Sequence, residues 1–166
     1  MASDKLTHLD DTGRVHMVDV GGKGATERRA VFECRVVLAP ETYRLLKEQG
    51  MPKGDVLTTA RIAGIQGAKQ TASLIPLCHP VGLSYADVRF SLLDEASSLR
   101  IEAEARTTGP TGVEMEALVA AQTAAMTVYD MCKGVQRDIE ITDCRLKHKS
   151  GGRSGTYEAG EPERPG

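Results

Sequence analysis

Apolar residues recur at helical spacing between residues 111 and 133, the longest periodic stretch of the chain. Apolar positions three and four residues apart predict an amphipathic helix whose apolar stripe packs on a core. The stripe consists of Met115, Leu118, Val119, Gln122, Ala125, Met126, Tyr129 and Cys132. One flank of this helix carries only small residues, Ala120, Thr123 and Thr127, between charged groups at the two ends. We expect this flank to form the floor of a polar pocket.

Strands are predicted where apolar and polar residues alternate, because successive side chains of a strand point to opposite faces of a sheet. The alternation covers residues 31–38, 88–92 and 99–106, and residues 139–146 indicate a fourth strand. Two further helices are expected between the first two strands. Pro40 and Gly50 frame the first of these helices.

Asp55 is a predicted N-cap for the second helix, over about residues 56–72, and two prolines fix a loop over residues 73–80. The order β-α-β-β-α-β predicts an α+β fold, a ferredoxin-like sandwich with an antiparallel sheet and helices packed on one face.

The chain divides into three parts on this interpretation. Residues 31–147 form a single α+β domain, and residues 1–30, which show little periodicity, form an N-terminal arm. Residues 148–166 form a flexible C-terminal tail that is basic and rich in glycine.

Composition restricts the classes of function. The chain has 166 residues, a formal net charge of −2, no Trp and 2 Phe. It therefore lacks the basic excess and the aromatic platforms expected of a nucleic-acid binder. No run approaches the roughly 18 apolar residues of a membrane span, and the first residues lack the apolar segment of a signal peptide. The 4 cysteines form no C-x-x-C pair, so we expect reduced thiols, a cytoplasmic location and no metal site.

Charged residues at the two ends of the long helix are the first candidates for chemistry. Lys133 follows Asp130 by three positions, so the ammonium and the carboxylate can meet on one face. The alternative is an ordinary surface ion pair, worth roughly 0.3–0.5 kcal/mol. At the other end, Glu114 and Glu116 flank Met115. The alternative for these two residues is structural, because acidic side chains at the N-terminus of a helix interact favourably with the helix dipole.

A histidine and several cations are the second set of candidates. His79 lies in the Cys78-His79-Pro80 loop. Histidine is the residue type that most often exchanges protons in enzymes, although a loop histidine is more often structural. The cations are Arg28, Lys53, Arg61, Lys69, Lys149 and Arg153. The chain has no Walker or G-x-G-x-x-G motif, so side chains would have to hold a nucleotide. Each cation alone can equally be a solvated surface residue, but together they favour a pocket for an anionic ligand.

Glu116 and Asp130 lie on the same flank of the long helix. At about 1.5 Å per residue, roughly 21 Å separate them along the axis. A compact site can hardly use both ends of one helix from a single chain. We therefore predict sites built across an interface between subunits.

Several long motifs, taken together, resemble the MoaC family, the cyclic pyranopterin monophosphate synthases of molybdenum-cofactor biosynthesis. The motifs are residues 16–20 with Lys23, Thr26 and Arg28, residues 53–56, residues 60–66 with Lys69, and residues 74–80, 111–118, 129–133 and 149–152. The resemblance extends over about residues 6–156. Gly67, Gly82, Gly134 and Arg153 depart from the family's usual residues. None of these departures removes a charged group from the site.

The resemblance implies a lyase that converts (8S)-3′,8-cyclo-7,8-dihydroguanosine 5′-triphosphate into cyclic pyranopterin monophosphate and diphosphate. It implies Asp130, Lys133 and Lys53 as catalytic residues. It also implies a substrate-binding set of Leu77, Cys78, His79, Glu114, Met115, Glu116, Arg28, Lys69 and Lys149. The family's assembly implies a homohexamer, a trimer of dimers. We expect no cofactor and no metal.

General acid–base catalysis requires groups that exchange protons near the working pH. Because neighbouring cations disfavour an ammonium, we expect a lowered pKa for Lys133. The alternative function is a non-catalytic ferredoxin-like module that binds a nucleotide and regulates a partner. Such a module would use the same cations without needing Asp130 and Lys133, and it would bind ligand without forming product.

Overall fold

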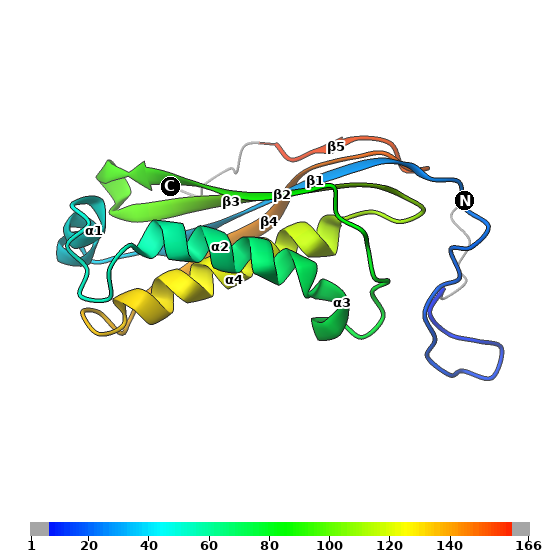
Figure 1. Cartoon of the computed structure of the whole chain (residues 1–166), viewed down its shortest axis with the longest axis horizontal. Helices are drawn as coiled ribbons and strands as arrows, with labels where there is room; N and C mark the ends of the chain where they lie inside the picture. Colours follow the sequence, from blue (N-terminus) through cyan, green and yellow to red (C-terminus); the bar gives the residue numbers. More distant parts are fainter. Residues whose placement is uncertain (1–6, 161–166) are drawn as a thin grey trace.

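An antiparallel sheet forms one layer of the molecule, and helices cover one of its faces (Figure 1). The computed structural model describes residues 7–160, and within them the sheet has 5 strands in the order β2-β3-β1-β4-β5. The strands are β1 (Thr26–Val37), β2 (Tyr85–Leu93), β3 (Ser98–Gly109), β4 (Glu140–Ser150) and β5 (Tyr157–Glu158). The helices are α1 (Pro40–Lys47), α2 (Val56–Lys69), α3 (Thr71–Leu74) and α4 (Glu114–Cys132), with a 3-10 turn over Asp94–Ala96.

This arrangement confirms the α+β ferredoxin-like fold. The helices of the β1–β2 connection and α4 of the β3–β4 connection lie on the same face (Figure 1). Several element bounds differ from the predicted ones. The first strand begins at Thr26, within the predicted arm, because β3 pairs with it from Thr26 and β4 pairs with it from Arg29. The predicted helix over residues 56–72 is interrupted between α2 and α3, and residues 1–6 and 161–166 lie outside the described part.

The C-terminal segment also carries structure that the alternation did not predict. The fourth strand continues to Ser150, and β5 pairs with its last residues, within the segment predicted to be a flexible tail. A two-residue strand has no periodicity of its own, so only its pairing partner makes it recognisable.

The buried face of α4 includes only part of the predicted apolar stripe, namely Val119, Ala125 and Cys132. Its fully buried positions are Ala117, Ala120, Ala121, Ala124, Ala125, Val128 and Cys132. Met126, placed in the predicted core stripe, is 55% exposed, and Met115, Leu118, Gln122 and Tyr129 are only partly buried. Small side chains let a helix approach its neighbours closely, so alanine positions face the interior here.

The small residues of α4 contact α2 and do not form the floor of a pocket. A Cβ added at Gly64 would lie 2.9 Å from the carbonyl oxygen of Ala120. One added at Gly67 would lie 2.5 Å from Oγ1 of Thr123. Real Cβ atoms almost never approach so closely, so each glycine matches a small residue of α4. The prediction that this flank of α4 forms the floor of a pocket is therefore wrong, because α2 packs directly against it.

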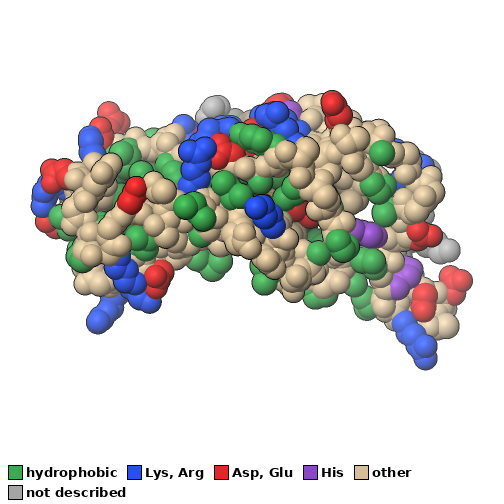
Figure 2. All heavy atoms as spheres, viewed as in Figure 1, with side chains coloured by type: hydrophobic (Ala, Val, Ile, Leu, Met, Phe, Trp, Pro, Cys, Tyr) green, Lys and Arg blue, Asp and Glu red, His purple; other side chains and the backbone are tan. Residues whose placement is uncertain are grey.

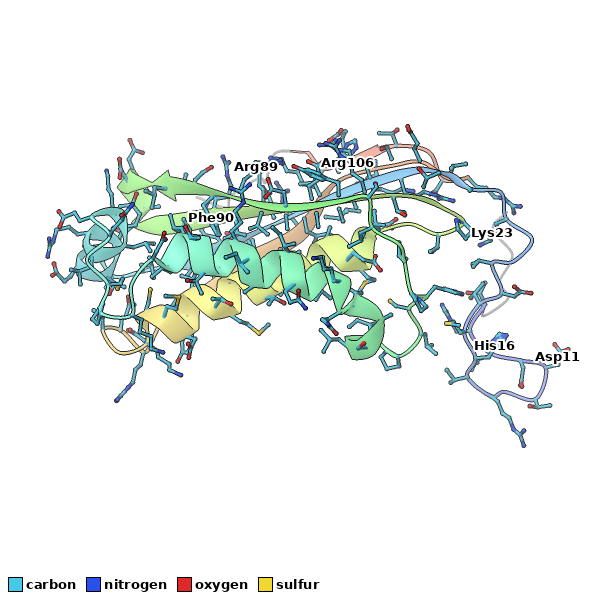
Figure 3. The ribbon with its side chains drawn as sticks, in the orientation of Figure 1. Asp11, His16, Lys23, Arg89, Phe90 and Arg106 are labelled. Carbon is cyan, nitrogen blue, oxygen red and sulfur yellow. The ribbon has the colours of Figure 1, made fainter. Side chains whose placement is uncertain are left out.

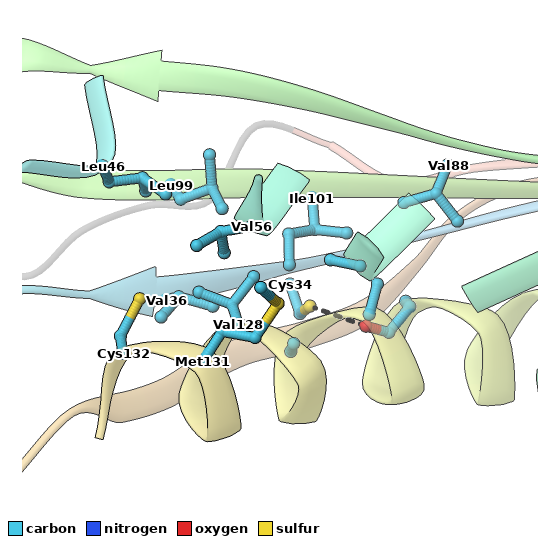
Figure 4. Close-up of a cluster of buried hydrophobic side chains, with 14 of the residues drawn as sticks. Cys34, Val36, Leu46, Val56, Val88, Leu99, Ile101, Val128, Met131 and Cys132 are labelled. Atoms are coloured by element: carbon cyan, nitrogen blue, oxygen red, sulfur yellow. Dashed lines mark hydrogen bonds between the residues drawn. The ribbon is translucent and has the colours of Figure 1, made fainter. Parts of the chain in front are cut away.

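The core lies between the sheet and these two helices, as Figure 4 shows. Leu99, Ile101 and Val128 are completely buried in it. The Cys34 thiol donates to the carbonyl oxygen of Ala121 at 3.6 Å (Figure 4). Burial raises the pKa of Cys34 to about 12, so this cysteine packs as an apolar residue.

The opposite face of the sheet carries charged side chains. Arg89 points away from the helices, whereas its neighbour Phe90 points toward them (Figure 3). Glu104 is 1% exposed and accepts hydrogen bonds from Arg29 at 2.8 Å and from Arg106 at 2.6 Å. Burial alone would raise the pKa of Glu104, but these hydrogen bonds outweigh it and lower the pKa to about 2. Among residues 7–160, no helix is long and apolar enough to cross a membrane.

Candidate functional site

The C-terminal end of α4 brings the three predicted catalytic residues together. The Asp130 carboxylate contacts the Lys133 ammonium at 2.7 Å and the Lys53 ammonium at 3.1 Å. Lys53 also donates to the carbonyl oxygen of Asp130 at 2.9 Å. The three side chains are about half exposed, so a ligand can reach them from solvent.

Local structure explains how Lys53 reaches α4. Met51 is buried, and the amide of Gly54 donates to its carbonyl oxygen at 3.0 Å, which closes a tight turn. Gly54 has φ +94°, a conformation that only glycine adopts easily. Asp55 then caps α2 by accepting from the Thr58 amide at 3.0 Å, as predicted. Lys53 is thereby held in the turn that precedes α2, opposite the end of α4.

The electrostatics of this cluster contradict one expectation. The hydrogen bonds from Lys133 and Lys53 lower the pKa of Asp130. The hydrogen bond to Asp130 raises the pKa of Lys133 above its usual value. The predicted lowering for Lys133 is wrong, because a carboxylate in direct contact acts more strongly than neighbouring cations. Asp130 is therefore ionised and Lys133 protonated at neutral pH.

The N-terminal end of α4 borders a cavity of about 370 Å³. Six of the predicted substrate-binding residues line it, Leu77, Cys78, His79, Glu114, Met115 and Glu116. Figure 2 shows the hollow between the arm and the body of the molecule, with histidine side chains at its border. The structure thus brings the loop over residues 77–79 against the start of α4.

The predicted arm supplies the other wall of this cavity. The lining residues that the sequence reasoning missed include Thr7, His8, Val18, Val20 and Lys23. Lys23 and His16 both lie on the arm in Figure 3. Lys23 belongs to the family motif that begins at residue 16, and this membership was the only signal that pointed to it.

Glu116 is the buried carboxyl group of this cavity, at 4% exposure. Burial raises its pKa, and the charge of Glu114 raises it further. Burial also raises the pKa of Cys78, and the charge of Glu116 adds to that effect. A thiol with a raised pKa is a poor nucleophile, whereas a carboxyl group with a raised pKa is suited to proton transfer.

Arg28 and Lys149 lie near this end of the molecule but outside the cavity lining. The Arg28 guanidinium donates to the carbonyl oxygens of Gly109 and Pro110, both at 3.3 Å, just before the start of α4. The Lys149 ammonium donates to the Ser154 hydroxyl. Lys69 is exposed in the last turn of α2, at the same end of the helix pair as the start of α4 (Figure 1).

The predicted site residues therefore form two groups at opposite ends of α4, a helix of 19 residues. Within the described part of the chain, no three His, Cys, Asp or Glu side chains gather as a possible metal site. The structure shows one group of ion-paired residues and one cavity with a buried acid, and it keeps them apart within one chain.

Comparison with known proteins gives the family. The model of the MoaC family matches residues 17–152. A cyclic pyranopterin monophosphate synthase of Nitratidesulfovibrio vulgaris is 61% identical over 154 residues, which is 93% of this chain and 96% of that protein. The synthase of Oleidesulfovibrio alaskensis is 59% identical, covering 95% of this chain and 99% of its own. The synthase of Chloroflexus aggregans is 54% identical, covering 95% and 96%. The chain belongs to the MoaC family.

Proposed function

We propose that the chain is a cyclic pyranopterin monophosphate synthase acting on (8S)-3′,8-cyclo-7,8-dihydroguanosine 5′-triphosphate. The family and the names of the relatives support a lyase of molybdenum-cofactor biosynthesis. The observation that carries the catalytic assignment is the contact of Asp130 with both Lys53 and Lys133. A regulatory module that only binds a nucleotide has no need for this arrangement.

In this proposal, Lys133 acts in its ammonium form. A carboxylate contact keeps Lys133 protonated, so it can donate a proton and stabilise negative charge that develops in the transition state. Asp130 remains ionised and orients both ammonium groups. Lys53 is the second donor, held by its bond to the carbonyl oxygen of Asp130.

Glu116 and His79 are the proposed groups that exchange protons while the purine-derived ring opens and the pterin ring forms. The raised pKa of Glu116 brings its titration closer to neutral pH. Glu114, Met115, Leu77 and Cys78 would shape the space around the ring, because they line the same cavity.

Formation of the cyclic phosphate requires a sugar hydroxyl oxygen to attack the α-phosphorus. The bond from that phosphorus to the oxygen bridging to the β-phosphate breaks, diphosphate leaves, and the hydroxyl proton passes to a base. Arg28, Lys69 and Lys149 are the proposed cations that offset the charge of the leaving diphosphate. Lys23 joins them in this proposal, because it lines the cavity.

The proposal includes a homo-oligomer, a hexamer made as a trimer of dimers, with each site shared by two subunits. Two observations support a shared site. The two groups of residues lie at opposite ends of α4, and large apolar side chains are exposed on the helix layer, including Ile62 at 64% and Met126 at 55%. Exposed apolar groups of this kind favour burial against a partner. The 4 free cysteines are in keeping with the proposed cytoplasmic location.

The first test measures diphosphate release and pterin formation from the cyclised substrate. We expect turnover by the wild-type chain and a loss of about 10²–10⁴-fold in Lys133→Ala, as for general acid–base groups. Lys47→Ala is the matched control, because Lys47 also forms an exposed ion pair, with Asp94 at 2.7 Å. Binding without turnover by the wild-type chain would support the regulatory module instead.

Mixing two inactive variants tests the shared site. Asp130→Asn and Glu116→Gln damage different ends of α4, so some sites of a mixed oligomer would receive both intact halves. After the two variants exchange subunits in equal amounts, each half of a site comes from an intact subunit with a probability of about one half. About one quarter of the sites should then have both halves intact, so about one quarter of the wild-type activity should return. No recovery despite demonstrated exchange would place both groups of one site in a single chain.

A further inference from the structure

The chain beyond β4 folds back as a hairpin. Glu158 pairs with His148, and Tyr157 pairs with Lys149. The amide of Ala159 donates to the carbonyl oxygen of Lys147 at 2.9 Å. Figure 1 shows β5 lying along the edge of the sheet, beside β4. The hairpin therefore involves the residues on both sides of Lys149, one of the proposed diphosphate-binding cations.

Side chains close this hairpin on the sheet face that carries no helices. His148 lies opposite Val31 in the register of β1 and β4, and its Nδ1 is hydrogen-bonded to the Glu158 carboxylate. Arg145 adds a hydrogen bond to the carbonyl oxygen of Gly160 at 3.0 Å. The His148–Glu158 hydrogen bond thus joins β5 to β4 on the face opposite to the one that carries the helices.

The turn of the hairpin rests on β1 at Arg28. Gly151 and Gly152 have φ of +93° and +76°, a region that favours glycine. A Cβ at Gly151 would collide with the carbonyl oxygen of Glu27, and a Cβ at Gly152 would collide with the Arg28 guanidinium. The two glycines therefore let the turn lie directly against the Arg28 side chain.

Arg28 and Lys149 share the helix-covered face of the sheet. Lys149 is the register partner of Ala30, which packs against Val113 and Ala117 at the start of α4. Arg28 precedes Ala30 by two residues, so its side chain leaves the same face. Its guanidinium is fixed by the carbonyl oxygens of Gly109 and Pro110.

These contacts place two cations beside the start of α4 through one structural element. The next residues after Pro110, Thr111 and Gly112, line the cavity. Lys149 is held by Ser154 of the same hairpin. An element that holds both cations in place before the ligand binds lowers the conformational entropy that these side chains lose on binding.

We propose that the β4–β5 hairpin is a positioning element for the phosphate groups of the substrate, and that Glu158 is a positioning residue. By pairing with His148, Glu158 keeps the hairpin closed, and the closed hairpin presents Lys149 and supports Arg28. This inference rests on the proposed function, which supplies the triphosphate. Glu158 contacts neither the cavity nor the proposed catalytic residues in the described part of the chain.

The test uses Glu158→Gln in the full chain, with Glu140→Gln as the matched control. Glu140 is exposed at the other end of β4. The dissociation constant for inorganic diphosphate is measured by calorimetry, and KM and kcat are measured with the cyclised substrate. We expect the dissociation constant and KM to rise about three- to fivefold, because a single hydrogen bond with an exposed carboxylate contributes modestly. The value of kcat should change less than about twofold, and the control should match the wild type.

A swapped pair provides the rescue. His148→Glu combined with Glu158→Lys should restore diphosphate affinity, whereas Glu158→Lys alone should weaken it. An unchanged dissociation constant in Glu158→Gln, or no binding of diphosphate by the wild-type chain, would overturn the inference. A wild-type chain that binds diphosphate but does not turn over substrate would overturn the proposed function alone, because the affinity measurement does not depend on catalysis.

Discussion

The two ends of α4 hold carboxyl groups in opposite electrostatic states. Asp130, at the C-terminal end, has a side chain that is 56% exposed and touches two ammonium groups. Glu116, at the N-terminal end, is 4% exposed and has no lysine or arginine partner among residues 7–160. The pKa of Asp130 is lowered by its lysines, and the pKa of Glu116 is raised by burial.

The helix dipole alone would give the reverse order. It favours a carboxylate at the N-terminal end of a helix and disfavours one at the C-terminal end, by about 0.3–1 kcal/mol. In this chain, direct ion pairs and burial outweigh it at both ends. The same residue class therefore differs in electrostatic state at the two ends, and in the proposed function it supplies a fixed charge at one end and an exchangeable proton at the other.

Removing the fixed charge should have the largest effect. Asp130→Asn keeps the shape of the side chain but leaves Lys53 and Lys133 without their carboxylate. We expect turnover to fall by about 10²–10⁴-fold, because the two ammonium groups lose their orientation. The measurement is steady-state diphosphate release, with Glu41→Gln as a control, since Glu41 is an exposed partner of Arg44. Equal losses in both variants would mean that the ion pair has no catalytic role.

The middle of α4 fixes the separation of the two ends, and it is the next place to intervene. Gly64→Ala would bring a methyl group within 2.6 Å of Val88 Cγ2 and 2.9 Å of the Ala120 carbonyl oxygen. Overpacking of this kind destabilises by about 1–3 kcal/mol, and each kcal/mol lowers Tm by roughly 2–4 °C. Thermal unfolding is compared with Gly82→Ala, where a Cβ meets no atom within 4 Å. Equal Tm values would show that α2 and α4 can separate without penalty.

The same close contact explains what sequence patterns could and could not predict. Alternation predicted four of the five strands of the described part, because the face of the sheet without helices carries charged residues such as Arg100 and Glu104. The buried face of α4 was only partly predicted, because alanine contributes little to an apolar stripe and most of the buried alanines were left out of it. The larger Met126 dominated the pattern although it is exposed. The alanines of α4 are buried because Gly64 lets α2 pack closely against them.

The candidate site was predictable to a similar extent. Spacing alone predicted the contact of Asp130 with Lys133, because residues three apart meet on a helix. No spacing rule joins Lys53 to them, since it precedes Asp130 by 77 residues, and only the family motif indicated it. The raised pKa of Lys133 was missed, because the prediction considered only the neighbouring cations and not the stronger effect of the carboxylate in contact.

The opposite pKa shifts of Glu116 and Asp130 predict opposite effects on stability. The folded pKa of Glu116 is raised above its usual 4.5. Ionisation of Glu116 therefore lowers the free energy of unfolding of the wild-type chain only as the pH rises above that value. Glu116→Gln should therefore raise Tm at pH 7, by roughly 2–4 °C for each kcal/mol relieved, and should match the wild type near pH 4. The folded pKa of Asp130 is lowered below its usual 3.8, so its stabilisation is lost as the pH falls through the folded value.

Asp130→Asn should consequently lower Tm slightly at pH 7, and this difference should vanish in strong acid. Thermal unfolding of both variants from strong acid to pH 8 measures the two differences. If Glu116→Gln lowered Tm at pH 7, Glu116 would have an ionic partner, and the contrast between the two ends would be lost.

The smallest expected effect concerns the thiol beside Glu116. Burial raises the pKa of Cys78, and the charge of Glu116 raises it further, so Glu116→Gln removes only the second cause. At pH 8.5, well above the usual pKa of a carboxyl group, alkylation of Cys78 by iodoacetamide should be about two- to threefold faster in Glu116→Gln than in the wild-type chain, because the thiolate fraction rises. Cys144 is exposed and serves as the internal control in site-resolved mass spectrometry. An unchanged rate at Cys78 would mean that the Glu116 carboxyl group carries no charge near this thiol even in alkaline solution. The exchangeable proton assigned to the N-terminal end of α4 would then have to belong to another group, with His79 the first to examine.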